Sequence, residues 1–187
     1  MRLAIISDTH LPRGQRALPA ACVERLRAAD AILHAGDFST VAVLRELEAL
    51  GPPVHAVHGN VDDPELRMLL PRVRTVTAGA ARIAMIHDSG PSGGRLGRMR
   101  RTFPDAHAVV FGHSHLPLLE SGADGFAIFN PGSPTERSSC CWVPSPQSMR
   151  MLSPPARRRI AGSPRRAVGT DPAVPAKNTD RSMSVRG

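Results

Sequence analysis

The chain has 187 residues, 41% of them apolar and 21% charged, which is enough for one domain with a hydrophobic core and excludes a wholly disordered protein. Its net charge of +8 is uneven: residues 1–134 carry 14 basic and 13 acidic side chains, whereas residues 135–187 carry 10 basic and 3 acidic ones. This distribution excludes a nucleic-acid-binding surface argued from overall charge alone.

The first part of the chain alternates short apolar runs with helical patterns. We predict buried strands at Leu3–Ser7, Ala31–Ala35 and Val54–Val57, because each run is short, apolar and followed by a polar residue or glycine. Helices are predicted at Pro19–Ala28 and Thr40–Leu50, where apolar residues recur at helical spacing. A β-α-β-α-β order is typical of an α/β sheet with parallel neighbouring strands.

The next part is richer in strands. Arg74–Thr77 and Arg82–His87 flank a short glycine-containing segment and predict a hairpin. Further strands are predicted at Ala108–Phe111 and Phe126–Asn130, where apolar runs again end in glycine or a turn. Helices of this part are expected at Pro64–Leu70 and Arg95–Thr102.

After Pro134 the sequence loses its periodicity and becomes rich in Pro, Ser and Arg. We expect a domain over residues 1–152, whose last part adds at most an edge strand at Met149–Leu152, and a disordered basic tail over residues 153–187. One lysine stands beside 23 arginines, as GC-rich coding produces, so the tail is either a genuine C-terminus or a frame-shifted one. If the tail binds nucleic acid weakly, deleting residues 153–187 abolishes that binding and leaves catalysis unchanged.

No apolar run approaches the ~20 residues that span a bilayer, and the apolar block after Arg2 is too short for a signal peptide. The three cysteines, Cys22, Cys140 and Cys141, do not form the paired framework of a secreted protein. We therefore expect a soluble, cytoplasmic protein with reduced thiols and no membrane partner; its oligomeric state stays open.

Each predicted parallel strand ends in polar side chains that can bind a metal ion. Ligands in open α/β sheets bind beyond the carboxyl ends of the strands, so we expect these donors to converge there. Two carboxylates, one amide oxygen and four imidazoles suit Mn²⁺, Fe, Zn²⁺ or Ni²⁺, and seven donors fit two ions ~3.5–4 Å apart if one carboxylate bridges them. The donors are Asp8, His10, Asp37, Asn60, His87, His113 and His115.

The order of these motifs resembles the signature of the calcineurin-like metallophosphoesterases. The residues that carry the resemblance are Asp8-x-His10, Gly36-Asp37, Gly59-Asn60-x-Asp62, His87 and Gly112-His113-x-His115, and Asn130-Pro131-Gly132-Ser133 points to the small prokaryotic phosphodiesterase branch. The resemblance covers residues 2–135. It implies a two-sheet sandwich flanked by helices, and hydrolysis of phosphodiester bonds by a hydroxide that bridges two metal ions.

The resemblance also implies a role for each donor. Asp8, His10 and His115 would hold the first ion, Asn60, His87 and His113 the second, and Asp37 would bridge them, with catalysis resting on Asp37, Asn60 and His113. Mn²⁺ is the expected ion, with Ni²⁺, Zn²⁺ or Fe as alternatives. Asp62 either orients a donor or begins the helix at Pro64.

The sequence departs from the family pattern beside two donors. Val61 stands where many members have a histidine that assists the leaving group, which favours diesters with good leaving groups. Asp88-Ser89 replaces a usual Gly-His pair.

Several alternatives stay open. A non-catalytic scaffold on the same fold is the alternative function, because a eukaryotic retromer subunit resembles this branch. Nucleic acid enters only as a substrate or as a weak contact of the tail. His58 either borders the site or is an inert strand residue. Four arginines either grip substrate phosphates or form a solvated helix face: Arg95, Arg98, Arg100 and Arg101.

Overall fold

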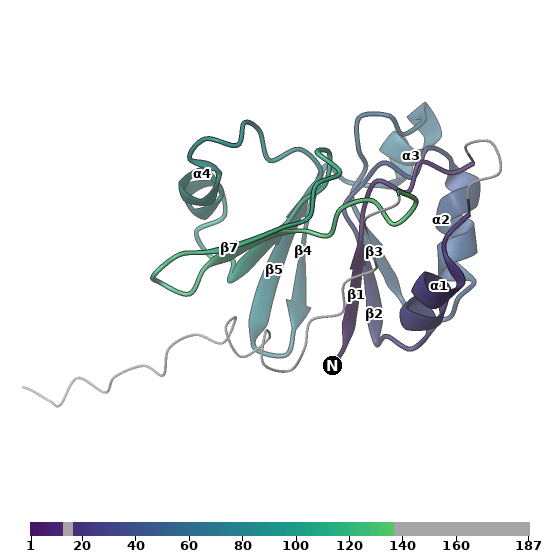
Figure 1. Ribbon diagram of the computed structural model, residues 1–187, viewed down its shortest axis with the longest axis horizontal. Helices are drawn as coiled ribbons and strands as arrows, with labels where there is room; N and C mark the ends of the chain where they lie inside the picture. Colours follow the sequence, from purple (N-terminus) through teal and green to yellow (C-terminus); the bar gives the residue numbers. More distant parts are fainter. Residues whose placement is uncertain (13–16, 137–187) are drawn as a thin grey trace, which may run out of the picture. The chain divides into compact units, whose positions relative to one another are not determined.

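The structure is a computed structural model that describes residues 1–12 and 17–136. These residues form two β-sheets, one with strand order β1-β2-β3 and one with order β4-β5-β6-β8-β7 (Figure 1). The predicted α/β class and two-sheet arrangement are confirmed.

The first sheet is parallel and is built from the β-α-β-α-β segment. Its strands are β1 (Leu3–Ile6), β2 (Ala31–His34) and β3 (Val54–Ala56), and its connecting helices are α1 (Ala20–Arg27) and α2 (Val41–Glu48). The helices cover the outer face, where Leu26 and Leu47 pack with Ile32 in one apolar cluster. Both faces of β1 and β2 are buried, which explains why their sequences read as continuous apolar runs.

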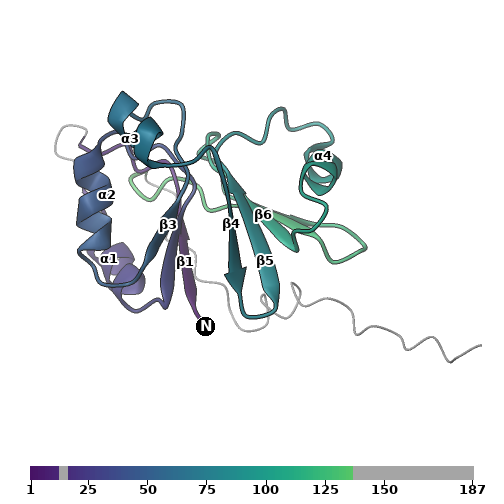
Figure 2. The same cartoon turned by 180° about the vertical axis from the view of Figure 1, so that it is seen from behind.

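The second sheet is mixed. An antiparallel hairpin of β4 (Val73–Ala78) and β5 (Ala81–Ile86) is followed by β6 (Ala108–Val110), which lies parallel to both β5 and β8 (Ala127–Asn130). The helices of this half of the chain are α3 (Pro64–Leu69) and α4 (Arg95–Thr102), and α4 lies on the outer side of the second sheet (Figure 2). Met99 of α4 packs there with Phe111 and Ile128.

Strand β7 (Leu118–Ser121), which pairs antiparallel with β8, was not predicted from the sequence. Three of its four side chains are exposed, so it lacks both the apolar run and the alternation by which the other strands were recognised.

The two sheets pack face to face through alternate residues of their strands. Leu3 and Leu33 of the first sheet meet Met85 and Val110 of the second in one buried cluster. Residues next to them in sequence, such as Ala4, point to the helix-covered face instead. This alternation is the period-2 geometry of a strand and defines the sandwich.

One further prediction is wrong, and others concern residues that the structure does not describe or a property that it does not test. Cys22, buried on α1, is disulfide-bonded, so the reduced thiol expected at this position is wrong. The predicted strand at Met149–Leu152 and the tail over residues 153–187 lie outside the described residues. Within the described ranges, no helix is long and apolar enough to cross a membrane; the cytoplasmic location stays a prediction.

Candidate metal centre

The seven predicted donors lie on loops at the ends of five strands, and the structure brings them together. Asp8 and His10 follow β1, Asp37 follows β2 and Asn60 follows β3, whereas the other three come from the second sheet: His87 after β5, and His113 and His115 after β6. Donors from the two sheets contact one another across the edge of the sandwich.

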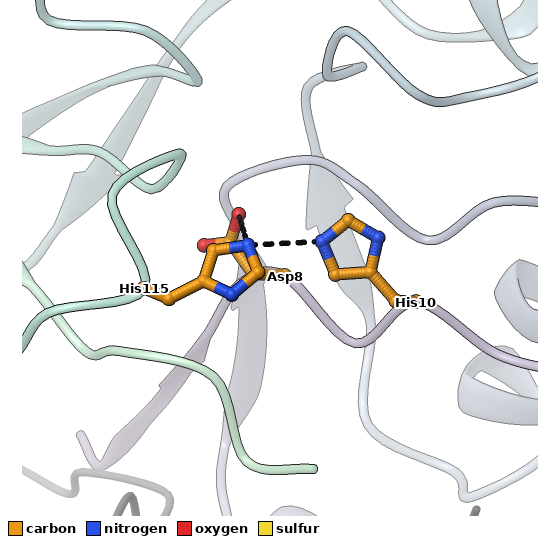
Figure 3. Close-up of side chains that lie close together, drawn as sticks. All are labelled: Asp8, His10 and His115. Atoms are coloured by element: carbon orange, nitrogen blue, oxygen red, sulfur yellow. Dashed lines mark hydrogen bonds and ion pairs between the residues drawn. The ribbon is translucent and has the colours of Figure 1, made fainter. Parts of the chain in front are cut away.

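We call Asp8, His10 and His115 the inner group. Their donor atoms lie within 4.8 Å of one another. His10 Nε2 is 3.0 Å from His115 Nε2, which in turn is 3.4 Å from Asp8 Oδ1, and Figure 3 shows the two rings turning these nitrogens toward each other beside the carboxylate. The Asp8 side chain is fully buried, while those of His10 and His115 are 13% and 27% exposed.

We call Asn60, His87 and His113 the outer group. The amide oxygen of Asn60 lies 3.0 Å from His87 Nε2 and 2.8 Å from His113 Nδ1. Asn60 and His113 are exposed, whereas His87 is buried. The outer group therefore faces solvent on one side.

Asp37 lies between the two groups. Its Oδ2 is 3.6 Å from His10 Nε2 of the inner group and 3.2 Å from His87 Nε2 of the outer group. Asp8 also reaches toward the outer group, since it forms a second cluster of donor atoms within 4.8 Å with Asp37 and His87. The two groups thus share buried carboxylates at their junction.

Two histidines are oriented by hydrogen bonds at their second nitrogen. His87 Nδ1 donates to the Ala35 carbonyl at 2.8 Å, and His115 Nδ1 contacts Glu136 Oε1 at 2.8 Å. In each neutral ring this leaves Nε2 with a lone pair facing the cluster. Glu136 was not foreseen from the sequence, because no local pattern links it to His115.

The backbone at the donors adopts an unusual conformation. Asp8, His10, Asp37, His113 and His115 have φ values of 54°, 47°, 62°, 70° and 56°. Residues other than glycine avoid this left-handed region because Cβ meets the backbone, and such strain is found mainly at functional sites. The loops turn sharply off the strands at positions where a donor side chain, and not glycine, is present.

The motif glycines allow close packing around the carboxylates. A Cβ added at Gly59 would collide with Asp37 Oδ1, and one at Gly112 would lie 2.7 Å from Asp8 Oδ2. Glycine at these two positions therefore lets the backbone approach the carboxylates closely.

Asp62 supports the loops of two donors. Its buried carboxylate accepts hydrogen bonds from the amides of Gly59 at 2.7 Å, Ser39 at 2.8 Å and Asp37 at 3.2 Å. The N-cap of α3 is instead Asp63, whose Oδ1 accepts from the Leu66 amide. Of the two sequence-based alternatives for Asp62, the orienting role fits the structure.

The turn after β8 braces the inner group from behind. Ser133 Oγ donates to the Asp8 carbonyl at 2.7 Å, and Asn130 Nδ2 donates to the Gly112 carbonyl at 2.8 Å. Both side chains are fully buried. Asn130 Oδ1 accepts from the Gly132 amide, so the turn is held together by the residue that contacts the donor loop.

Burial and pairing set different protonation preferences on the ionisable donors. Burial raises the pKa of Asp8 above its ordinary value, although a hydrogen bond from Ser7 opposes this. Burial also disfavours ionised Asp37, but hydrogen bonds from His87 and the Val61 amide outweigh it and lower the pKa of Asp37. Burial lowers the pKa of His87, but the Asp37 carboxylate outweighs burial and raises it. Positive charge beside Asp37 is therefore favoured.

The donor set fits divalent cations. In the part of the chain that the structure describes, the ion pairs of Asp8 and Asp37 are all with histidines, so no lysine or arginine neutralises these buried carboxylates. Carboxylate oxygen, amide oxygen and imidazole nitrogen are donors that first-row divalent metals accept. A cation placed among facing lone pairs would relieve their repulsion and compensate the carboxylates.

A pocket of about 380 Å³ adjoins the outer group. It is lined by His58, Gly59, Asn60, Arg67, Arg72, Ile86, His87 and Asp88. His58 therefore borders the site, as one of its two sequence-based interpretations held. Arg67 and Arg72 were not singled out from the sequence, since neither belongs to a motif.

The arginines considered as phosphate ligands are engaged elsewhere. Arg98 donates to the carbonyls of Ser89 and Gly93, and Arg95 lies 5.0 Å from the Phe111 ring centre. Arg100 pairs with Asp124 at 2.8 Å. Three of the four thus hold the loop and helix around α4 in place, which differs from both the phosphate-binding role and a merely solvated face.

Comparison with known proteins agrees with the motifs. The family model of the calcineurin-like phosphoesterase superfamily domain matches residues 1–149, beyond the 2–135 of the sequence resemblance. A "Probable metallophosphoesterase" from Methanothermobacter thermautotrophicus is 34% identical over 72% of this chain and 78% of its own length, and one from Methanocaldococcus jannaschii is 33% identical over 72% and 69%. A crystal structure of a Vps29 mutant from Entamoeba histolytica is similar with a TM-score of 0.63, at 26% identity over 74% of this chain and 78% of that one.

Proposed function

Because the chain belongs to the calcineurin-like phosphoesterase superfamily, we propose that it is a phosphodiesterase whose seven donors hold two divalent cations. At the level of the family it is a metallophosphoesterase. The observation that carries the finer proposal is the place of Asp37, whose Oδ2 lies within 3.6 Å of a histidine of each donor group. A carboxylate in that place suits a bridge between two ions.

We assign the inner group to the first cation and the outer group to the second, with Mn²⁺ as the proposed ion and Ni²⁺, Zn²⁺ or Fe as alternatives. When bound, the cations would lower the pKa of a water molecule to supply the nucleophile and would neutralise charge on the phosphoryl oxygens. Asn60 and His113, which are exposed, would lie closest to an incoming ester. Asp62 and Ser133 hold the donor loops in place through their hydrogen bonds with the backbone of Asp37 and Asp8.

The residue after Asn60 bears on which leaving groups the site can release. Val61 is 46% exposed and offers no proton to a leaving group, while its backbone amide donates to Asp37 Oδ1 at 3.0 Å. Loss of a general acid typically costs ~10²–10⁴ in rate for poor leaving groups. Esters whose leaving group departs as a stable anion are therefore the expected substrates.

The test is hydrolysis of bis(p-nitrophenyl) phosphate and of p-nitrophenyl phosphate with added Mn²⁺. We expect faster turnover of the diester, loss of turnover in chelator, and a fall of about 10³-fold in kcat/KM for Asp37→Ala and His113→Ala, since each donor contributes several kcal/mol of charge stabilisation. Asp105→Ala, at an exposed carboxylate whose ion pair is with Arg82 and not with a donor, serves as the control.

Native mass spectrometry of the same preparation counts the ions. Two Mn²⁺ per chain, reduced in Asp37→Ala, would support the paired arrangement. Metal-independent turnover, undiminished rates in the variants, or a single ion at saturation would each contradict the corresponding part of the proposal.

A second candidate is a scaffold on the same fold. It is favoured by the likeness to Vps29, a vacuolar protein sorting protein. A scaffold requires neither the full set of donors nor strained backbone at five of them. If Mn²⁺ binds but no phosphate ester is hydrolysed above the rate of Asp37→Ala, the scaffold becomes the better account.

A further inference from the structure

We propose that the pocket beside the outer group binds a second phosphate of the substrate, through the guanidinium groups of Arg67 and Arg72. This rests on the phosphodiesterase activity proposed above and narrows its substrate class to diesters that carry a further phosphate on one arm.

The pocket and the outer group share a wall. Asn60 and His87 belong to both, so an ester held at the outer group has the pocket directly beside it. A volume of about 380 Å³ is at the lower end of small-ligand sites, which suits a phosphate with part of the group that bears it.

Arg67 is already fixed toward the site. It lies on α3, is exposed, and one of its terminal nitrogens donates to the Asn60 backbone carbonyl. A guanidinium has five N–H donors in a planar fork, so this bond leaves donors for a ligand. The hydrogen bond links the position of Arg67 to the loop of an outer-group donor.

Arg72 is available for a ligand. Among the described residues its side chain has no hydrogen bond or ion pair, although it lines the pocket. It lies between Pro71 and the first residue of β4. The Pro71 carbonyl accepts a hydrogen bond from the His58 amide, which ties this segment to the pocket wall. Arginine forks match phosphate oxygens two at a time, which makes such a residue suited to phosphate recognition.

The charge of the pocket favours a dianion. Among the described residues that line it, Asp88 is the only acidic one, and the Asp88 carboxylate already accepts a hydrogen bond from the Gly90 amide at 2.7 Å. Two guanidinium groups against one occupied carboxylate leave net positive charge. A terminal phosphate carries about −2 at neutral pH and matches two arginines, whereas the scissile diester carries a single charge and is expected at the donors.

The experiment compares two substrates that differ only in the second phosphate. They are thymidine 5′-(p-nitrophenyl phosphate) and the same ester phosphorylated at the 3′ oxygen, both followed by release of p-nitrophenolate with Mn²⁺. We expect kcat/KM to be ~10–100-fold higher for the 3′-phosphorylated ester, mostly through a lower KM, as charge-assisted hydrogen bonds imply.

Four variants locate the effect. Arg72→Gln should reduce the preference for the second phosphate at least ~5-fold, whereas Asp88→Asn should increase it because the opposing carboxylate is removed. Arg27→Gln, at an exposed position of α1 outside the pocket, should leave the preference as in the wild type. Arg67→Gln should also reduce the preference for the second phosphate, but it removes the hydrogen bond to the Asn60 carbonyl as well.

The outcomes separate the two proposals. Hydrolysis of both esters with equal kcat/KM, or a preference retained in Arg72→Gln, overturns the phosphate-binding pocket and leaves the phosphodiesterase standing. No Mn²⁺-dependent hydrolysis of either ester overturns both.

Discussion

The inner and outer groups each combine two histidines with one oxygen donor, a carboxylate in the inner group and an amide in the outer one, but they lie in different surroundings. Behind the inner group, Asp8 is fully buried and Ser133 donates to its carbonyl, while Glu136 forms a hydrogen bond with His115. Beside the outer group, exposed Asn60 borders a pocket with two arginines. Buried, hydrogen-bonded polar networks are rigid, whereas an open pocket admits a ligand. The difference indicates that one side of the centre is fixed by the protein and the other is left for substrate.

The largest expected effect is on metal binding by the inner group, and it comes from a change at Glu136. Glu136→Gln removes the charge that orients His115 and should weaken Mn²⁺ binding ~10–100-fold, as is typical for carboxylates behind a metal-binding histidine. Isothermal titration measures the affinity, and activity should recover at high Mn²⁺. Glu120→Gln on β7 is the matched control. Equal affinities of the two variants would show that the inner group does not depend on Glu136.

Removing the hydroxyl behind Asp8 should weaken the fold itself. Ser133→Ala leaves the buried Asp8 carbonyl without this donor, so we expect the free energy of unfolding to fall by about 1–3 kcal/mol. Urea denaturation measures it, with Ser121→Ala on exposed β7 as the control. A change below 0.5 kcal/mol, on the order expected of a surface site, would mean that the brace is dispensable.

Low pH should lower the stability of the fold through the buried side chain of His34. Its buried ring accepts the Gly36 amide at Nδ1 and contacts Thr9 at Nε2, and burial, with a smaller contribution from His87, lowers its pKa well below the ordinary value. Below pH ~6.5 the unfolded chain therefore binds a proton on His34 that the folded chain excludes. As the pH decreases, the free energy of unfolding should fall by up to ~1.4 kcal/mol per pH unit.

The measurement is urea denaturation between pH 5 and 7 in chelator. His34→Asn, which retains an acceptor near the place of Nδ1, should show a shallower slope than the wild type. Identical slopes would contradict the assignment.

The smallest effect isolates the backbone strain. His115 has φ of 56°, so His115→Gly should be more stable than His115→Ala by about 1 kcal/mol, although both lose the imidazole. Thermal or urea unfolding of the two variants gives the difference. A more stable alanine variant would show that the loop relaxes out of the left-handed conformation.

Much of the centre could be predicted because its signals are local. Asp8, Asp37 and His113 each follow an apolar run that reads as a strand, and strand ends in an α/β sheet meet at one edge. The predicted strands differ from the observed ones mainly at their ends, as with Leu3–Ser7 against Leu3–Ile6.

The features that were missed depend on contacts between distant residues. Glu136 meets His115 across 21 positions, and Arg72 reaches the pocket only because β4 follows α3 beside the loop of Asn60. Arg98 was considered as a phosphate ligand on its charge alone, yet its guanidinium is used by loop carbonyls. The charge of a residue and its spacing in the sequence do not show which partner its side chain contacts in the folded protein.

Each donor group combines side chains from both halves of the sandwich: Asp8 with His115 in one, Asn60 with His87 in the other. Ions bound there would cross-link the two sheets, in addition to the apolar packing between them. By mass action, free metal at about 100 times its dissociation constant would add ~2.7 kcal/mol per independent site to the unfolding free energy. The melting temperature of this protein would then serve as a gauge of the metal supply around it.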